Sequence, residues 1–339
     1  DSLTGLLDRQ AGAAKVAEHC EALGVENVTA IAFELVSFGK INDSIGMQLS
    51  DKVLKLLTKR LLKVYPNSLA FFRTHGDQFF LLFNKNQDLV AEMLKLFDFV
   101  QRPFAVRGEV VVLAIRAGLV KTGHDLTSSD SLIHAAELAL HSAKSSVEKA
   151  ISFKPSMLQK TKKNYEIGNE LRVSLVNNAK ELHDGEKNSE FYLNYQPVMQ
   201  VATSKVTEFE ASISWQHPKR GLLSFSDFEG TAEDIGAVRV LDIWSIYRAC
   251  KHAVQWNLDL NKGDEIGVRV NIHMSQFLQK GLLLKILQRA VEQSKLAPNL
   301  IHLEVRELKR MPPKVYEILR DIREFGCKIT LDNFGEGST

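Results

Sequence analysis

The stretch from residue 70 to residue 83 constrains the fold more than any other part of the chain. Two apolar runs flank a polar segment at residues 73–77. Large apolar side chains fall on both alternation faces of each run, which is typical of strands that are covered on both sides. Gly76 provides the backbone freedom that a tight turn needs, and Asp77 is the acid placed beside it. The stretch predicts a buried β-hairpin, whose polar turn is either a simple connection or part of a functional site.

Composition is that of an ordinary globular chain. The 339 residues are 45% hydrophobic and 25% charged, a length that suits about two domains. The net charge of +2 is too balanced to indicate a nucleic-acid footprint by itself. The three cysteines show no C-x-x-C spacing, which argues for reduced thiols and against a zinc site. No apolar run has the length of a membrane span, so we expect cytoplasmic domains and leave open an inner-membrane tether upstream of Asp1.

The first half of the chain has the pattern of an α+β domain. Apolar spacing predicts a strand at residues 28–35 and helices at residues 9–23, 47–64, 88–100 and 130–147. A second hairpin is expected to turn near Arg107 and Gly108. Helices that cover a largely antiparallel sheet give an α+β domain, which we assign to residues 1–154.

Residues 155–190 are polar and rich in lysine, yet they predict a connecting helix followed by a loop. Apolar residues recur at helical spacing along it, namely Leu171, Leu175, Ala179 and Leu182. Such a stripe serves either dimerisation or docking onto a neighbouring domain.

From residue 191 the pattern changes to alternating strands and helices. Strands are expected near residues 191–197, 205–215, 266–272, 300–305 and 328–331. Asn271, Glu304 and Asp332 end the last three strands, and Glu210 lies on an earlier one. A TIM-like barrel builds its active site at such positions, although each residue could equally be an ordinary polar strand end. We therefore expect residues 191–339 to form the first part of an α/β TIM-like barrel, truncated in this chain.

Two motifs give the first half a family resemblance. Residues 1–9 resemble the D-x-L-T-G-L-x-N-R opening of the GGDEF family of diguanylate cyclases, and residues 73–79 resemble its R-x-G-G-D-E-F signature. The resemblance implies a cyclase-like half-site for one GTP and two metal ions. The family's metal-binding positions match Glu34 and Asp77, and its guanine-binding positions match Asn42 and Asp51.

Three positions of this domain depart from the family. His75 replaces a signature glycine where the backbone approaches the triphosphate. Gln78 replaces the signature glutamate, and a neutral amide neither acts as a base nor binds a metal as an anion. In the phosphate-binding A-K-x-x-G-R-N stretch Lys144 is kept, but Glu148 stands at the arginine position. The inhibitory R-x-x-D site would fall on residues 66–69 and is absent. We therefore expect a cyclase fold without cyclase activity.

The second half resembles the EAL family of cyclic di-GMP phosphodiesterases. Six motifs carry the resemblance. They are Y-Q-P at residues 195–197, E-A-L-x-R-W-x-H-P at 210–218, A-E-x-x-G at 232–236, V-N-x-S at 270–273, E-x-T-E at 304–307 and L-D-D-F-G-T-G at 331–337. The family activates water with two divalent ions. The resemblance implies that the metal ligands are Glu210, Asn271, Glu304 and Asp332.

Three departures weaken the phosphodiesterase site. Ser214 replaces the arginine that clamps the substrate phosphate. Asn333 replaces the second acid of the D-D pair, and Glu336 replaces a threonine of the loop that governs the metal site. Gln196 of the Y-Q-P motif stays as a remnant of the nucleotide site.

These departures favour a regulator over an enzyme. We expect a catalytically degenerate GGDEF–EAL protein that acts through a protein or RNA partner, for example in the turnover of regulatory RNA. We expect it to bind GTP and cyclic di-GMP weakly or not at all and to require no cofactor. The EAL-like site would hold at most one Mg²⁺ or Mn²⁺ ion. A homodimer is a further possibility. The alternatives are a cyclic di-GMP receptor without hydrolysis and a weak phosphodiesterase.

Overall fold

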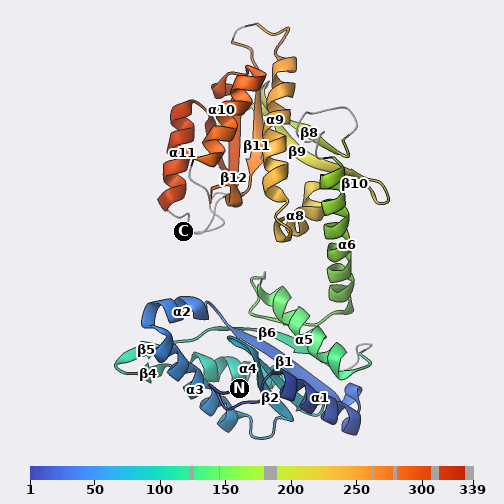
Figure 1. Cartoon of the computed structure of the whole chain (residues 1–339), viewed down its shortest axis with the longest axis vertical. Coiled ribbons are helices and arrows are strands. Elements are labelled where there is room, and N and C mark those ends of the chain that lie inside the picture. Colours follow the sequence, from blue (N-terminus) through green and yellow to red (C-terminus); the bar gives the residue numbers. More distant parts are fainter. Residues whose placement is uncertain are drawn as a thin grey trace. The chain divides into compact units, whose positions relative to one another are not determined.

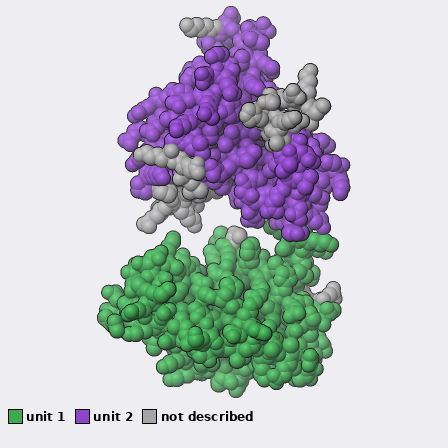
Figure 2. Space-filling model, in the orientation of Figure 1, with its two compact units in different colours: residues 1–162 green, residues 163–339 purple. Residues whose placement is uncertain are grey.

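The computed structural model divides the chain into two compact units, Asp1–Lys162 and Lys163–Thr339 (Figures 1 and 2). It describes residues 1–121, 126–144, 146–178, 189–261, 263–277, 281–306 and 313–332. Among these residues, no helix combines the length and the apolar character that crossing a membrane requires.

A five-stranded sheet forms the centre of the first unit. Its order is β2-β3-β1-β6-β7, with β7 parallel to β6 and the other pairs antiparallel. The strands are β1 (Val28–Leu35), β2 (Ala70–His75), β3 (Gln78–Asn84), β6 (Ile115–Val120) and β7 (Ala150–Ser152). The predicted hairpin is confirmed as β2 and β3, and Gly76 turns between them at a φ of 53°.

Helices cover both faces of this sheet, as the two-sided alternation of the hairpin predicts. The helices are α1 (Arg9–Leu23), α2 (Phe38–Ile45), α3 (Met47–Val64), α4 (Leu89–Gln101) and α5 (Ser129–Lys144). On one face Phe33 stacks on Phe79 in a core shared with α3 and α4. On the other face Phe72 stacks on Phe80 in a core shared with α1 and α5. The expected second hairpin, β4 (Phe104–Val106) and β5 (Glu109–Val111), forms a separate two-stranded sheet.

The connecting helix is α6 (Pro155–Asn177), and its apolar stripe docks onto the second unit. Ile167 and Leu171 are fully buried in the core of that unit, and Leu175 packs against it. Of the two roles open for the stripe, docking within the chain is therefore the one that these residues perform. Ala179 and Leu182 lie outside the described residues.

The second unit is built on a six-stranded sheet. Its order is β10-β9-β11-β12-β13, and β8 also pairs with β9. The strands are β8 (Phe191–Gln200), β9 (Lys205–His217), β10 (Gly221–Ser224), β11 (Gly267–Ile272), β12 (Ile301–Arg306) and β13 (Lys328–Asp332). Strands β9, β11, β12 and β13 are mutually parallel. Closure into a barrel stays a prediction, because no closing pair joins β13 to β8 or β10 within the described residues.

Helices lie against one face of this sheet (Figure 1), and the apolar side chains of that face pack against them. The helices are α8 (Phe225–Asp234), α9 (Val238–Trp256), α10 (Leu282–Ser294) and α11 (Pro313–Phe325). Val268, Val270, Leu303 and Val305 are buried in this core. The alternate residues of the same strands therefore occupy the opposite face.

The expectation of a helix between the first two strands of this half is wrong. Strands β8 and β9 are an antiparallel pair joined by a tight turn, in which the backbone N–H groups of Thr203 and Ser204 donate to the Gln200 carbonyl at 3.2 and 2.8 Å. A parallel crossover needs a dozen residues or more, far more than this connection contains.

Gly118 on β6 allows α5 to pack directly against the sheet. A Cβ added there would meet the backbone of Ala136 and Leu140, which cannot move without shifting the helix. We expect Gly118→Ala to lower the free energy of unfolding by about 3 kcal/mol, measured by urea unfolding followed by circular dichroism. Gly39→Ala is the control, because nothing surrounds Gly39 on its exposed helix, and it should be neutral or slightly stabilising. An unchanged Gly118→Ala variant would contradict the close packing.

Asp242 is a buried acid in the second unit. Its carboxylate accepts from the His273 backbone N–H at 3.0 Å and from Gln276 Nε2 at 3.2 Å, and burial raises its pKa to about 7, with the charge of Glu229 adding to the rise. A raised carboxyl pKa makes the folded state bind more protons than the unfolded state, so stability falls as pH rises from about 4 to about 7.

We therefore expect Asp242→Asn to gain stability over the wild type between pH 5 and pH 8, by at most about 4 kcal/mol. Tryptophan fluorescence during urea unfolding measures this, since all three tryptophans lie in the second unit. Asp234→Asn, at an exposed helix end, should keep the wild-type pH dependence. Equal pH profiles for the wild type and Asp242→Asn would refute the prediction.

Candidate functional site

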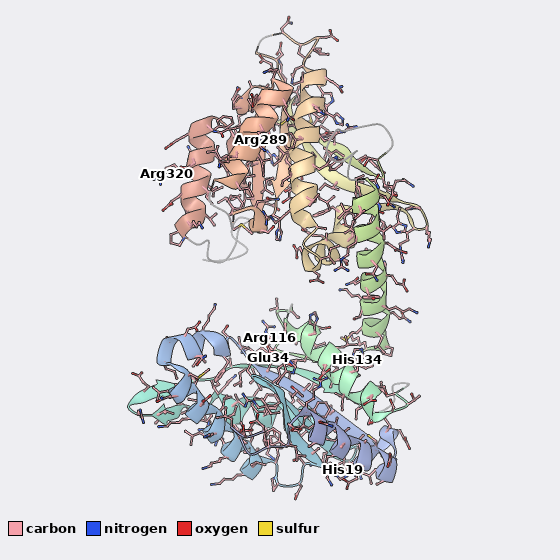
Figure 3. All side chains as sticks on the ribbon, viewed as in Figure 1. His19, Glu34, Arg116, His134, Arg289 and Arg320 are labelled. Atoms are coloured by element: carbon pink, nitrogen blue, oxygen red, sulfur yellow. The ribbon has the colours of Figure 1, made fainter. Side chains whose placement is uncertain are left out.

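The polar cluster of the first unit lies where β1, the β2–β3 turn and the end of α5 meet. Glu34 on β1 is the register partner of Gln78 on β3 and of Arg116 on β6, which lies beside it in Figure 3. The Glu34 carboxylate accepts a hydrogen bond from the Gln78 amide and forms an ion pair with Lys144. The Asp77 carbonyl accepts from the Leu35 N–H at 3.1 Å, which ties the turn to β1.

Asp77 and Glu34 affect each other electrostatically. Burial raises the pKa of Asp77, its own backbone N–H lowers it, and the charge of Glu34 raises it further. Lys144 and His75 oppose that rise. The two sequence-predicted metal positions of this unit are therefore neighbours, and the charge of Lys144 acts on both.

This arrangement fits a divalent ion poorly. Carboxylate oxygens are the ligands that Mg²⁺ prefers, and two carboxylates are present. However, Lys144 and Gln78 both engage the same oxygen of Glu34, Oε2. A metal would have to displace the lysine ammonium before it could use that oxygen.

Arg73 joins the two motifs of this unit, a link that sequence reasoning missed. Its Nε donates to the Gly76 carbonyl at 2.7 Å, and its Nη1 lies 3.1 Å from Asp1 Oδ1. Asp1 in turn accepts from the backbone and hydroxyl of Thr4 at 2.8 and 2.7 Å. The opening stretch therefore fixes the turn through a charged pair. The spacing gave no signal for it, because the two motifs are far apart in sequence.

The remaining predicted positions of this unit are spread around the cluster. Asn42 accepts from the Ser50 hydroxyl at 2.8 Å, and the charge of Asp51 acts on Arg73. His75 and Glu148 are exposed. The structure thus brings Glu34, Asp77, Gln78 and Lys144 into one cluster and leaves Glu148 outside its hydrogen bonds.

The second unit carries its polar residues on the face of the sheet opposite the helices. The four positions predicted at strand ends do converge. Asn271 Nδ2 donates to Glu210 Oε1 at 3.1 Å, and Asn271 is the register partner of Glu304. Burial raises the pKa of Glu304, and the charges of Glu210 and Asp332 raise it further. Their role as metal ligands stays a prediction.

Sequence reasoning missed a second row of residues on this face. Glu208, Arg269 and His302 each lie two residues before a predicted ligand on the same strand, so the strand alternation places them on the same face. Glu208 Oε2 accepts from Arg269 Nε at 3.2 Å and pairs with His302 Nδ1 at 2.8 Å, and Arg269 Nη1 donates to Glu304 Oε1 at 3.3 Å. His302 also contacts the Thr330 hydroxyl at 2.5 Å. The period-two pattern could have revealed this row.

The two positions that would meet the substrate differ in exposure. Ser214 is only 3% exposed, and its hydroxyl accepts from Asn194 Nδ2 at 2.7 Å. Gln196 is exposed, and it is the register partner of Glu210. Asn333 and Glu336 lie outside the described residues.

The described part of the chain contains no preformed metal site. None of its clusters of three or more histidine, cysteine, aspartate or glutamate side chains is arranged to hold a metal ion. In the second unit an arginine occupies the space between the carboxylates of Glu208 and Glu304. Of the predicted ligands in this unit, Glu304 is therefore already paired with a cation of the chain, as Glu34 is in the first unit.

Comparison with known proteins matches both halves of the chain. The model of the diguanylate cyclase GGDEF domain matches residues 1–150, and that of the EAL domain matches residues 179–339. The chain is 31% identical over 99% of its length to the cyclic di-GMP phosphodiesterase NbdA of Pseudomonas aeruginosa, covering 42% of that protein. It is 28% identical over 92% of its length to the signalling protein YkoW of Bacillus subtilis, covering 38% of it. The chain thus spans about two fifths of the length of these relatives.

A solved structure has the same two-domain fold. The S helix–GGDEF–EAL part of LapD from Vibrio cholerae, bound to cyclic di-GMP, aligns with 99% of this chain and 76% of its own length, with a TM-score of 0.56 and 18% identity. The family models, the relatives and this fold confirm the resemblance inferred from the motifs. The chain therefore belongs to the proteins that carry a GGDEF domain followed by an EAL domain.

Proposed function

We propose that this chain is a regulatory GGDEF–EAL protein in which both domains serve as binding modules for a protein or RNA partner and neither acts as an enzyme. The observation that carries the proposal is the contact of Lys144 and Gln78 with Glu34. A cyclase must place a metal ion on this carboxylate to neutralise the charge that develops during phosphoryl transfer. Here the carboxylate is already satisfied by the chain itself.

The triphosphate side of the first domain also argues against catalysis. His75 stands where a glycine would admit the phosphates, and its exposed imidazole adds bulk there. Gln78 cannot accept a proton, and the resemblance assigns that position to a carboxylate. Glu148 would repel a triphosphate at a position where the family has a cation.

At position 214 the second domain offers no charged partner for the substrate. Ser214 is neutral, buried and paired with the neutral Asn194, so this position offers no cation to a phosphodiester. The acids Glu210, Glu304 and Asp332 remain, but Arg269 already pairs with Glu304. This combination supports a fold kept for recognition.

A second candidate function is cyclic di-GMP binding or slow hydrolysis by the EAL domain. It is favoured by the hydrogen bond from Asn271 to Glu210 and by the charges of Glu210 and Asp332 close to Glu304. The P. aeruginosa relative is named a phosphodiesterase, and the V. cholerae structure holds cyclic di-GMP. A single Mg²⁺ or Mn²⁺ would polarise a phosphoryl oxygen, but it would lack the two-metal clamp.

We expect the protein to make no cyclic di-GMP from GTP and Mg²⁺, because three different requirements fail at His75, Gln78 and Glu148. Gln78→Glu alone should not restore activity, since His75 would still block the phosphate pocket and Glu148 would still repel the triphosphate. Chromatography of the reaction products measures this. Synthesis by the wild type near 1 per second would refute the proposal for the first domain.

We expect weak binding of cyclic di-GMP, since loss of one charged phosphate contact lowers affinity by about 30-fold to several thousand-fold. Calorimetric titration tests this, together with an assay of hydrolysis in Mn²⁺. Ser214→Arg should not help, because the side chain has no room, and it should lower stability by about 1 to 3 kcal/mol. Gln216→Arg, at an exposed position of the same strand, is the control and should be neutral. Sub-micromolar binding of cyclic di-GMP would support the receptor function. Hydrolysis near 1 per second would support the phosphodiesterase function.

A further inference from the structure

The inner face of the second unit carries acids together with cations that include Arg269 and the exposed Lys328, the register partner of His302. The acids are Glu208 and Glu210 on β9, Glu304 on β12 and Asp332 on β13. Glu208 and Glu304 have side chains only 12% and 10% exposed. Carboxylates that are partly removed from water need a compensating positive charge, because water no longer screens their repulsion.

Arg269 lies among these acids. Its Nε is 3.2 Å from Glu208 Oε2, its Nη1 is 3.3 Å from Glu304 Oε1, and its side chain is 17% exposed. An arginine stays protonated at every physiological pH, so its charge is permanent. Its register partners on the two neighbouring strands are Glu210 and His302, which places it inside the set of acids.

The hydrogen bonds around Arg269 make its position rigid. Glu208 is held from a second side by His302 Nδ1 at 2.8 Å, and His302 also contacts Thr330. The network therefore links strands β9, β11, β12 and β13. An arginine held by carboxylates on two different strands is unlike a mobile surface lysine. If it left, Glu304 would lose its ion pair and Glu208 would keep only His302 as a partner in this network.

We propose that Arg269 is a resident counter-ion that takes the place of a divalent metal in this unit. It pairs with Glu208 and Glu304, keeps their strands in register, and repels any divalent ion that approaches Glu304. Lys144 contacts Glu34 of the first unit in a comparable way. The inference goes beyond the proposed function, because it concerns how the second domain folds without metal, whatever the domain binds.

The test uses the full chain, stripped with EDTA, and three variants: Arg269→Gln, which removes the charge, Arg269→Lys, which keeps it, and Arg289→Gln. The last is the matched control, because Arg289 is exposed on α10 (Figure 3). Thermal unfolding is followed by tryptophan fluorescence with and without Mn²⁺. All three tryptophans lie in the second unit, so metal binding by the first unit does not enter this signal directly. Electron paramagnetic resonance counts the Mn²⁺ ions bound by each variant.

The wild type and Arg289→Gln should keep the same midpoint within about 1 °C when Mn²⁺ is added. Arg269→Gln should unfold at a lower temperature in EDTA, regain several degrees with Mn²⁺, and bind one more Mn²⁺ than the wild type. Arg269→Lys should be less stable than the wild type but show no response to Mn²⁺.

Two results would overturn the inference: a wild-type midpoint that rises by several degrees with Mn²⁺, or an Arg269→Gln variant as stable in EDTA as the wild type. If Arg269→Gln fails to fold in every condition, the test rests on the wild type and Arg269→Lys. A midpoint that rises with Mn²⁺ in either protein would then contradict the inference. A wild type that binds Mn²⁺ tightly yet hydrolyses nothing would overturn this inference and leave the proposed function standing. If the wild type hydrolyses cyclic di-GMP while its unfolding midpoint does not change with Mn²⁺, the proposed function is wrong and this inference stands.

Discussion

The alternation of side chains along β-strands is the constraint on which both units depend. In the first unit the strands are apolar on both faces, so helices must cover both, and the polar groups collect at the turn that follows β2. In the second unit one face is apolar and packs against helices, while the other carries acids and Arg269. The position of each candidate site follows from this difference in patterning.

In both candidate sites, carboxylates pair with cations of the chain itself. Lys144 pairs with Glu34 in the first unit, and Arg269 pairs with Glu208 and Glu304 in the second. Internal pairing lowers the free energy of the unliganded state, so any added metal must first break those contacts.

Much of the architecture could be predicted from the sequence. Strand β1 and helix α3 have the predicted bounds, and the β2–β3 hairpin turns at Gly76, because strong periodicity and a tight turn are local properties. The short helix α2 and the small strand β10 were not predicted, since eight and four residues carry too little periodic signal. The helix expected between β8 and β9 is a turn, because a four-residue connection can only join antiparallel strands.

The sequence by itself determined which residue types stand at the candidate sites: the carboxylates, the substitutions at His75, Gln78 and Ser214, and the order of motifs. Only the tertiary structure decided what these side chains contact. Residues such as Lys144 and Glu34, or Arg269 and Glu304, are far apart in the chain, and no local pattern encodes their ion pairs. Register between strands and the docking of α5 on the sheet bring them together, and these depend on the packing of the whole core.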